Sequence, residues 1–282
     1  MKLFKKVSEL RYHLNQLTNA KKTIGFVPTM GALHQGHLSL VERAKAKNDF
    51  VVVSIFVNPT QFNETSDLTT YPRTPVEDIN KLIKSKCDFL FYPTSDDVYP
   101  PGLDTSVDVD FGILDTVMEG EHRPGHFVGV AQVVKRLLEI VEPTRLYLGQ
   151  KDFQQFTIIK HMVKTLNMEV KTVRCPIVRE KDGLAMSSRN VRLTPEHRAV
   201  APQIRQVLLY AREMAGTYSP ADIKKICIEQ LDTKLLQPEY FEIVDRLTLE
   251  PLKEQFDFVR SAVACTAIWA GDVRLIDNII LF

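Results

Sequence analysis

A nearly continuous run of β-branched and aromatic residues at positions 50–57, FVVVSIFV, is the feature that most constrains the fold of this 282-residue chain. A strand that is apolar on both faces must be buried on both faces, as in a parallel sheet with helices on both sides. Further strand-like runs at residues 24–27, 89–92, 145–148 and 170–174 alternate with helical patterns, which indicates right-handed βαβ units. We therefore expect an α/β fold, a Rossmann-like parallel sheet with helices on both faces.

The last third of the chain follows a different pattern. Thr-Pro at positions 194–195 and Ser-Pro at 219–220 are typical helix starts, with a capping hydroxyl before a proline at the first helical position. Strand-like runs follow at residues 240–244, 258–269 and 273–281. Helices followed by consecutive strands predict a smaller C-terminal α+β domain.

The composition argues against several classes of function. Apolar residues make up 44% of the chain, charged residues 25%, and the formal net charge is +1, which disfavours a nucleic-acid or membrane-surface protein. No apolar stretch of a secretory signal follows the first residues, MKLFKKVSEL, so a cytoplasmic location is expected. The four cysteines lack CxxC or zinc-ligand spacing and are expected to be reduced core residues: Cys87, Cys175, Cys227 and Cys265.

Residues 25–40, GFVPTMGALHQGHLSL, contain the most informative turn of the chain. Pro28 cannot donate to a central ladder, so the strand that begins at residue 24 is expected to end there. Gly31 and Gly36 bracket a tight turn, and apolar residues spaced by three after Gly36 predict a helix. The segment is therefore interpreted as a strand-to-helix connection.

His34 and His37 flank the second of these glycines, at the predicted helix start. The first backbone N–H groups of a helix have no partner inside it, and the helix dipole favours negative charge there. Imidazole can donate to a phosphate oxygen and can carry a positive charge near neutral pH. The pattern favours a nucleotide phosphate site over a plain turn with two surface histidines.

Polar segments follow three of the predicted strands, at residues 28–37, 58–61 and 149–152. In an open parallel sheet, ligands bind beyond the carboxyl ends of the strands. We therefore expect these segments, although far apart in sequence, to meet at one edge of the sheet.

The side chains in and after these segments fit a nucleotide and a small hydroxylated acid. Asn58, Gln61 and Gln155 offer amides that suit hydroxyls and a carboxylate, although ordinary loop and helix polarity would look the same. Lys151 can place a cation on a triphosphate. Asp152 can accept from a ribose hydroxyl or can cap the following helix.

A second polar segment, Met-Ser-Ser-Arg at residues 186–189, follows a probable Asp-Gly turn. Two hydroxyls and an arginine after a glycine turn can form a mobile anion clamp. A plain polar linker between domains is the alternative.

Two further polar clusters are interpreted as structural or weaker candidates. Asp104, Asp108 and Asp110 have the spacing of a solvated edge strand over residues 107–111, so no metal site is predicted. The segment GEHRPGHF contains His122, interpreted as a structural histidine, and His126, a weaker active-site candidate.

Four motifs in order resemble those of the pantoate–β-alanine ligase (pantothenate synthetase) family: FVPTMGALHQGHLSLV, NPTQF, GQKD and MSSRN. HQGH also looks like the HxGH signature of the nucleotidyltransferase superfamily. The likeness extends from about residue 2 to Ile-Asp-Asn at 276–278, nearly the whole chain. Gln150 departs from the family's usual GEKD. Gly-Asp-Val-Arg at 271–274 departs from the usual GKTR and is interpreted as surface variation.

The resemblance implies an AMP-forming ligase that condenses (R)-pantoate with β-alanine in coenzyme A biosynthesis. The implied reaction consumes ATP with Mg²⁺, passes through a pantoyl-adenylate, and releases AMP and pyrophosphate. The family is typically dimeric, so a homodimer is expected. With a boundary near Pro176, residues 1–176 would form the Rossmann-like nucleotide- and pantoate-binding domain, and residues 177–282 a C-terminal α+β lid domain.

The resemblance also implies roles for individual residues. Catalysis is assigned to His37, His34, Lys151 and Arg189, with electrostatic stabilisation expected ahead of the proton-donor role that the family gives His37. Substrate contacts to pantoate and β-alanine are assigned to Gln61, Gln155 and Asn58. The expected ATP contacts are Met30, Gly31, Ala32, Leu33, His34, Gln35, Gly36, His37, Gly149, Gln150, Lys151, Asp152, Val178, Met186, Ser187, Ser188 and Arg189.

Two other functions are compatible with these motifs. One is a nucleotidyltransferase of the same superfamily that acts on a phosphorylated small molecule, which would need a second anion site. The other is a non-catalytic nucleotide sensor, which should have lost one of the charged phosphate ligands that this chain retains. A tRNA ligase is disfavoured because the chain has no basic surface signature.

Overall fold

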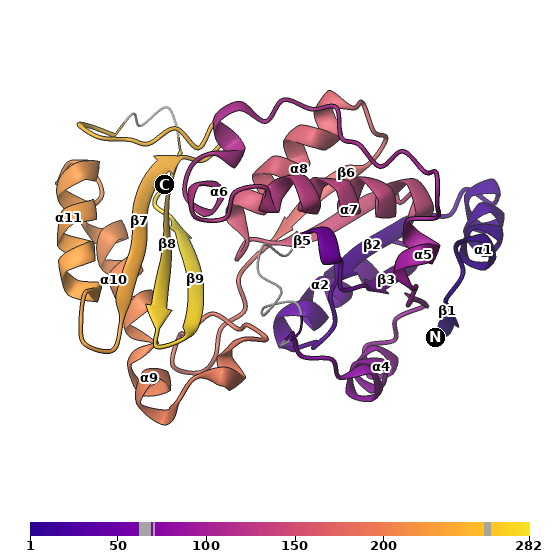
Figure 1. Ribbon diagram of the computed structural model, residues 1–282, viewed down its shortest axis with the longest axis horizontal. Helices are drawn as coiled ribbons and strands as arrows, with labels where there is room; N and C mark the ends of the chain where they lie inside the picture. The colour runs from indigo at the N-terminus through magenta and orange to yellow at the C-terminus, as the bar shows by residue number, and fades with distance from the viewer. Residues whose placement is uncertain (62–68, 70, 257–260) are drawn as a thin grey trace. The chain divides into compact units, whose positions relative to one another are not determined.

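The computed structural model describes residues 1–61, 69, 71–256 and 261–282, and the chain forms two compact units (Figure 1). Unit 1 comprises Met1–Phe111, Arg123–Gly149 and Ile158–Pro176. Unit 2 comprises Gly112–His122, Gln150–Thr157 and Ile177–Phe282, and so includes two segments from earlier in the sequence. The domain boundary near Pro176 stays a prediction.

Unit 1 contains a six-stranded parallel sheet in the order β1-β4-β3-β2-β5-β6. The chain reverses its direction of progress across the sheet between β2 and β5, which is the topological switch point of a doubly wound fold. The strands are β1 (Lys2–Phe4), β2 (Ile24–Thr29), β3 (Phe50–Ile55), β4 (Phe89–Phe91), β5 (Arg145–Gly149) and β6 (Lys171–Cys175).

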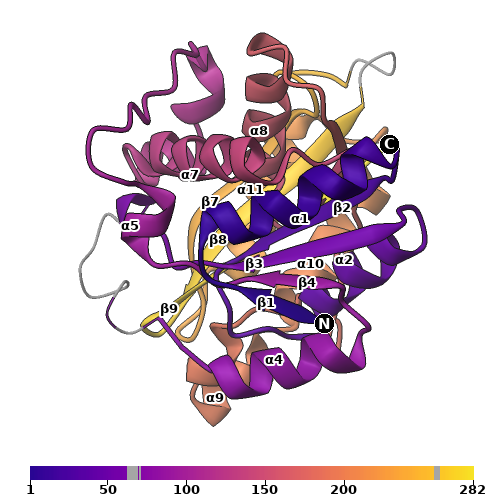
Figure 2. The ribbon, with the colours of Figure 1, turned by 90° about the vertical axis from the view of Figure 1, so that its right-hand side faces the viewer.

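Helices cover both faces of this sheet (Figure 2). α1 and α7 lie on one face, and α2 and α4 lie on the other, where Val41 and Leu82 join Val51 and Val53 of β3 in one apolar core. In the described part of both units, no helix has the length and apolar content needed to cross a membrane. The helices are α1 (Val7–Asn19), α2 (Gln35–Lys45), η1 (Pro59–Gln61), α4 (Pro75–Lys84), α5 (Ser95–Val98), α7 (His126–Val141) and α8 (Phe153–Thr165), whose first turn belongs to unit 2.

β2 corrects one prediction, because it continues through Pro28 to Thr29. Pro28 pairs with Ser54 of β3. The carbonyl oxygens of Thr23 and Thr29 accept backbone N–H groups of the neighbouring segment at 3.1 and 3.0 Å, so odd-numbered residues face β3. Since backbone groups alternate in direction along a strand, Pro28 presents its nitrogen to β5. Pairing with β5 ends at Phe26, so the ladder needs no N–H from the proline.

Two other parts of the sheet differ from expectation. β1, a three-residue edge strand beside β4, was not predicted. The predicted strand over residues 107–111 is absent, and within this segment the Asp110 carbonyl lies 3.1 Å from His161 Nε2, a side-chain contact in place of a ladder bond. The Asp104 carboxylate accepts the backbone N–H of Ser106 at 2.9 Å, a contact that competes with a ladder.

Unit 2 contains a three-stranded antiparallel sheet in the order β7-β8-β9, with α10 and α11 packed on it around Phe241 and Ile268 (Figure 1). Thr194 and Ser219 cap helices as predicted, since their hydroxyls accept backbone N–H groups at 3.3 and 3.1 Å. Positions 258–260 of the predicted middle strand lie outside the described residues. The elements are η2 (Gly112–Asp115), α6 (Glu119–His122), η3 (Asn190–Arg192), α9 (Pro195–Val200), α10 (Gln203–Met214), α11 (Pro220–Leu231), β7 (Gln237–Asp245), β8 (Ala262–Ala270) and β9 (Val273–Ile280).

The four cysteines are free thiols, and all of them are buried. Burial raises the pKa of Cys87 and of Cys227 to about 12 and that of Cys175 to about 11. These groups therefore stay protonated and pack as small apolar side chains.

Candidate active site

The HQGH turn of unit 1 starts helix α2 and is built around its two histidines. His34 is the N-cap residue, and its Nδ1 accepts the backbone N–H of Gly36 at 3.1 Å. His37 Nδ1 accepts the backbone N–H of His34 at 3.3 Å, so the two rings form a reciprocal capping box. The ring centroids lie 4.1 Å apart.

This capping pattern fixes the tautomer of both rings. A nitrogen that accepts a hydrogen bond carries no proton, so the proton of each neutral ring lies on Nε2. His34 and His37 therefore each have an Nε2–H donor at the N-terminus of α2. This chemistry suits a phosphate, whose oxygens accept hydrogen bonds and favour a helix N-terminus.

The turn before His34 is held by Asp78, a residue that sequence reasoning missed. Gly31 and Ala32 both have left-handed backbones, with φ of 88° and 48°. The Asp78 carboxylate accepts the consecutive backbone N–H groups of Ala32 at 2.9 Å and Leu33 at 2.7 Å. Lys81, one helical turn later, donates to the Leu33 carbonyl at 2.6 Å. Two residues of α4 therefore hold the turn: Asp78 bonds two of its backbone N–H groups, and Lys81 bonds one of its carbonyls.

The orientation of α4 explains why Asp78 could not be recognised in the sequence as a residue that supports the site. Asp78 is 1% exposed, whereas the apolar Val76 and Ile83, which mark this helix in the sequence, are 66% and 54% exposed. An aspartate that bonds the turn while apolar residues of the same helix are exposed can be recognised only once the orientation of the helix is known. The periodicity predicts the helix but not the direction in which Asp78 points.

The loops after the adjacent strands β2 and β3 meet within unit 1, as parallel topology predicts. The Gln61 amide donates to the Met30 sulfur at 2.9 Å. Asn58 is fully buried, and its amide donates to the Thr60 hydroxyl at 2.9 Å and to the Gly129 carbonyl at 3.2 Å. Asn58 therefore holds the η1 turn that bears Gln61.

In unit 2, Asn278 of β9 holds the segment that follows β5. Its amide nitrogen donates to the backbone carbonyls of Gln150 and Lys151, each at 2.9 Å. The Gln150 side chain donates in return to Asn278 Oδ1 at 3.2 Å. Lys151 Nζ lies 3.9 Å from the Asp152 carboxylate. Asn278 therefore holds the backbone that carries Lys151, the predicted phosphate ligand, through hydrogen bonds to backbone carbonyls.

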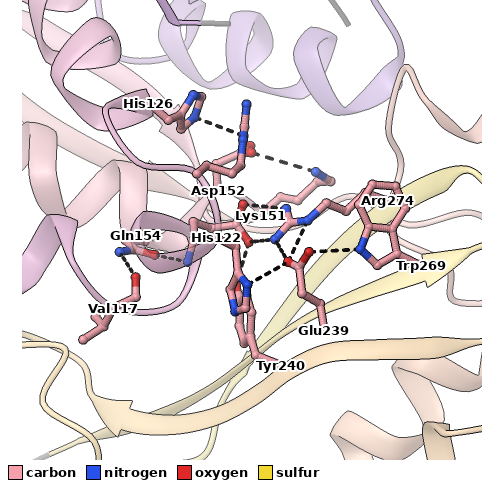
Figure 3. A network of polar contacts seen from close by, with 12 residues as sticks. Val117, His122, His126, Lys151, Asp152, Gln154, Glu239, Tyr240, Trp269 and Arg274 are labelled. Carbon is pink, nitrogen blue, oxygen red and sulfur yellow. Dashed lines mark hydrogen bonds and ion pairs between the residues drawn. The ribbon is translucent and has the colours of Figure 1, made fainter. Parts of the chain in front are cut away.

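Gln154 ties the first turn of α8 to the segment 112–122 of the same unit (Figure 3). Its Oε1 accepts the Glu119 N–H at 3.0 Å, and its Nε2 donates to the Leu114 and Val117 carbonyls, each at 2.8 Å. The next residue, Gln155, is partly buried on that first turn.

Arg274, which matches the arginine of GKTR, joins segment 112–122 to the C-terminal sheet. Of the two residues that depart from GKTR, Asp272 is exposed but Val273 is buried, so the interpretation as surface variation is wrong for Val273. The Arg274 guanidinium forms two hydrogen bonds with the Glu119 carboxylate at 2.7 and 2.9 Å and also contacts Glu239 (Figure 3). The Arg274 and Glu119 side chains are 15% and 10% exposed. Burial lowers the pKa of Arg274, but hydrogen bonds and charge from Glu119 and Glu239 outweigh the effect of burial and raise that pKa.

Aromatic and imidazole groups complete this network. The Tyr240 hydroxyl donates to Glu119 at 2.8 Å, and burial followed by the Glu119 charge raises the pKa of Tyr240 well above its ordinary value. The His122 ring stacks on Tyr240 at 5.6 Å between centroids, and the Trp269 indole donates to Glu239 at 2.9 Å. These contacts support the structural interpretation of His122.

The Met-Ser-Ser-Arg segment lies beside Val178. The Met186 N–H donates to the Val178 carbonyl at 3.0 Å, and Ser187 Oγ accepts the Arg189 N–H at 3.2 Å. An antiparallel bridge joins Arg179 to Ala185, just before this segment, and the Arg179 side chain forms two hydrogen bonds with Asp277 of β9 at 2.6 and 2.9 Å. The predicted adenine contact and the predicted anion clamp therefore belong to one local structure.

The predicted site residues thus form two groups. Met30 to His37, Asn58, Gln61 and Gly149 belong to unit 1. Residues 150–152, Gln155, Val178 and residues 186–189 belong to unit 2. The convergence of both groups on one ligand stays a prediction.

A doubly wound parallel sheet with a histidine-capped turn at the start of the helix after β2 is the architecture of a Rossmann-like nucleotide-binding α/β domain. A family model described as Pantoate-beta-alanine ligase matches residues 2–280. The pantothenate synthetase of Porphyromonas gingivalis is 49% identical over 280 residues, which cover 99% of each chain. The chain therefore belongs to the pantoate-beta-alanine ligase family, and it is a ligase.

Solved structures agree with this assignment. The pantothenate synthetase from Thermus thermophilus is 43% identical and gives a TM-score of 0.92, with 100% of both chains covered. The ligase from Francisella tularensis, complexed with beta-gamma ATP and beta-alanine, is 35% identical with a TM-score of 0.81, and 100% of this chain and 98% of that chain are covered. The fold class, the family and the enzyme class predicted from the sequence are confirmed.

Proposed function

We propose that this chain condenses pantoate with β-alanine at the expense of ATP, through a pantoyl-adenylate, and releases AMP and pyrophosphate. The family match over residues 2–280 supports the reaction. The observation that carries the proposal is the HQGH turn, whose two rings have their protons on Nε2 at the N-terminus of α2.

The chemistry needs an activated acid. A carboxylate is a poor acyl donor because its leaving group would be oxide. In the first step, a pantoate carboxylate oxygen bonds to the α-phosphorus of ATP, the bond from that phosphorus to the bridging oxygen breaks, and pyrophosphate leaves. In the second step, the β-alanine amine bonds to the acyl carbon, AMP leaves, and the amine nitrogen loses a proton.

The first step builds negative charge on the phosphates, and four of the predicted site residues are proposed to offset it. His34 and His37 donate through Nε2–H, and Lys151 and Arg189 supply positive charge. Mg²⁺ is proposed to arrive on the ATP phosphates as part of the co-substrate. His37 acts as a hydrogen-bond donor first, and proton transfer is secondary.

Further contacts position ATP. We assign the ribose to Asp152, the adenine to the backbone at Val178, and phosphate oxygens to the Ser187 and Ser188 hydroxyls. The remaining ATP contacts in the proposal come from backbone and side chains of Met30, Gly31, Ala32, Leu33, Gln35, Gly36, Gly149, Gln150 and Met186.

Gln61 and Gln155 are proposed to bind the hydroxyls and carboxylate of pantoate. An amide can both donate and accept, which suits the hydroxyls and carboxylate of pantoate better than a phosphorylated substrate. Asn58 supports Gln61 indirectly, because its amide bonds Thr60 and Gly129. A homodimeric assembly, which the family resemblance implies, and a cytoplasmic location complete the proposal.

The reaction is tested by measuring pyrophosphate release from ATP by the purified protein. Release is expected only when pantoate is present, and pantothenate should form when β-alanine is added. Equal release with other hydroxy acids would contradict the assignment of pantoate as the substrate.

The role of the turn is tested by H37A. Removing one preorganised donor is expected to lower the rate of adenylate formation about a hundred- to a thousandfold. The matched control is H13A, which removes an imidazole on α1 whose ring packs against Phe4. An unchanged rate in H37A would remove His37 from the mechanism.

A further inference from the structure

The η1 turn, which bears Gln61, contacts the first two turns of helix α7, and both elements belong to unit 1. His126, Gly129 and Gln132 follow one another at a spacing of three, so they share one face of this helix. The side-chain amide oxygen of Gln132 accepts the Thr60 hydroxyl at 3.0 Å. α7 therefore contacts the turn at every position of this face.

His126 makes the contact nearest to Gln61. Its Nδ1 lies 2.8 Å from the Gln61 backbone carbonyl, and His126 as a residue is 8% exposed. A carbonyl only accepts, so Nδ1 must carry the proton. Nε2 then accepts from the Arg123 guanidinium, which lies 3.2 Å away. Both neighbours select the same neutral Nδ1–H tautomer, the opposite of the one at His34 and His37.

Gly129 brings the helix and the turn into direct backbone contact. A Cβ at this position would lie 2.4 Å from the Thr60 carbonyl oxygen and 2.9 Å from the Gln61 Cα, far inside contact distance. Any larger residue at position 129 would therefore displace the turn.

We propose that His126 is a positioning residue, which, together with Gly129, sets the place of the Gln61 side chain and so the affinity for the hydroxy acid. This inference rests on the proposed function, because it takes Gln61 as a pantoate ligand. His126 contacts the backbone of Gln61 and acts through it.

The kinetic test compares H126A, H126N and H126Q by pyrophosphate release. An asparagine amide nitrogen takes nearly the place of Nδ1, whereas a glutamine amide nitrogen takes that of Nε2. We expect H126A and H126Q to raise the KM for pantoate about tenfold, the scale of one lost hydrogen bond, with the KM for ATP unchanged within about twofold. H126N should stay close to wild type. An unchanged pantoate KM in H126A, or an equal rise of both KM values, overturns the proposal.

A double variant tests whether His126 acts through Gln61. Q61A and H126A/Q61A should have the same pantoate KM, since the residue that His126 positions is already gone. A further tenfold rise in the double variant overturns the proposal.

If H126A does not fold, G129A replaces it, with V128A on the exposed side of the same helix as the matched control. G129A should raise the pantoate KM and V128A should not; equal KM values for the two variants overturn the proposal.

A spectroscopic test is independent of activity. ¹⁵N NMR of the histidine rings in the wild-type protein should show the Nδ1–H tautomer for His126 and the Nε2–H tautomer for His34 and His37. The Nε2–H tautomer or an imidazolium at His126 overturns the proposal. A wild-type protein that releases no pyrophosphate with pantoate contradicts the proposed function instead, while the tautomer result stands.

Discussion

In each unit, a buried side chain forms hydrogen bonds with two consecutive backbone groups of a predicted ATP-binding segment. The side chain is an acceptor in unit 1 and a donor in unit 2. In unit 1, the Asp78 carboxylate accepts the N–H groups of Ala32 and Leu33. In unit 2, the Asn278 amide donates to the carbonyls of Gln150 and Lys151. The acceptor is charged, whereas the donor is neutral.

The difference reflects what each backbone requires. Ala32 has a left-handed conformation, which costs free energy for a residue with a Cβ, and the charge-assisted bonds from Asp78 offset that cost. The segment held by Asn278 has further support, since Gln150 bonds Asn278 in return and Gln154 bonds three backbone groups. The comparison therefore predicts that the Ala32 and Leu33 N–H groups of unit 1 depend on Asp78, with Lys81 holding only the Leu33 carbonyl, whereas several side chains hold the segment of unit 2.

Among the variants that test this comparison, the largest effect is expected from D78N. An asparagine can accept only one of the two N–H groups and turns its own donor toward the other. We expect kcat/KM for ATP to fall about a hundredfold, since hydrogen bonds to a charged group are each worth about 1.5–3 kcal/mol. Pyrophosphate release at varied ATP concentration measures this effect.

The matched control for D78N is E77Q, which removes an exposed carboxylate from the same helix. E77Q should behave as wild type. If D78N and E77Q have the same kcat/KM, the turn does not depend on Asp78, and the contrast between the units is lost.

The local parts of the fold could be predicted from the sequence. The alternation of strands and helices, the helix start at HQGH and the caps at Thr194 and Ser219 depend on residues within a few positions of one another, where periodicity and capping chemistry decide. The predicted end of β2 was wrong. Whether Pro28 leaves a ladder hydrogen bond unmade depends on how far the neighbouring strand β5 extends, and the periodicity of the sequence does not report this.

The supports of the candidate site could not be predicted, because they join residues that are far apart in sequence. Asp78 bonds a residue 46 positions away, Asn278 one 127 positions away, and Arg274 one 155 positions away. An aspartate on a helix or an arginine after a turn has the same local signature whether it is buried or exposed. Only the packing of the elements decides which side chain is buried against a functional loop.

A smaller effect is expected from N278A. The variant leaves two backbone carbonyls without their donor, but Gln154 still holds the start of α8. We expect kcat/KM for ATP to fall about tenfold, which corresponds to about 1.4 kcal/mol and lies within the range for a buried group left unsatisfied. Pyrophosphate release measures it, and N15A, an exposed asparagine on α1, serves as the control. A loss as large as that of D78N would show that unit 2 also relies on a single side chain.

The smallest effect is expected from Q150E, which introduces the acid that the family usually has at this position. In this chain the Gln150 amide donates to Asn278 Oδ1 at 3.2 Å, and a carboxylate cannot donate. Losing one neutral, partly exposed hydrogen bond should lower kcat/KM for ATP about two- to threefold, at the low end of the usual range. Pyrophosphate release at varied ATP concentration measures the change.

The double variant Q150E/N278A separates this hydrogen bond from other effects of the new charge. If the bond to Asn278 is the cause, Q150E should have no further effect once Asn278 is an alanine, because the acceptor is already gone. A two- to threefold decrease that persists in the N278A background would instead assign the effect to the negative charge near the ATP phosphates. In that case Gln150 would influence ATP directly, and the support of the unit 2 segment would rest on Asn278 and Gln154.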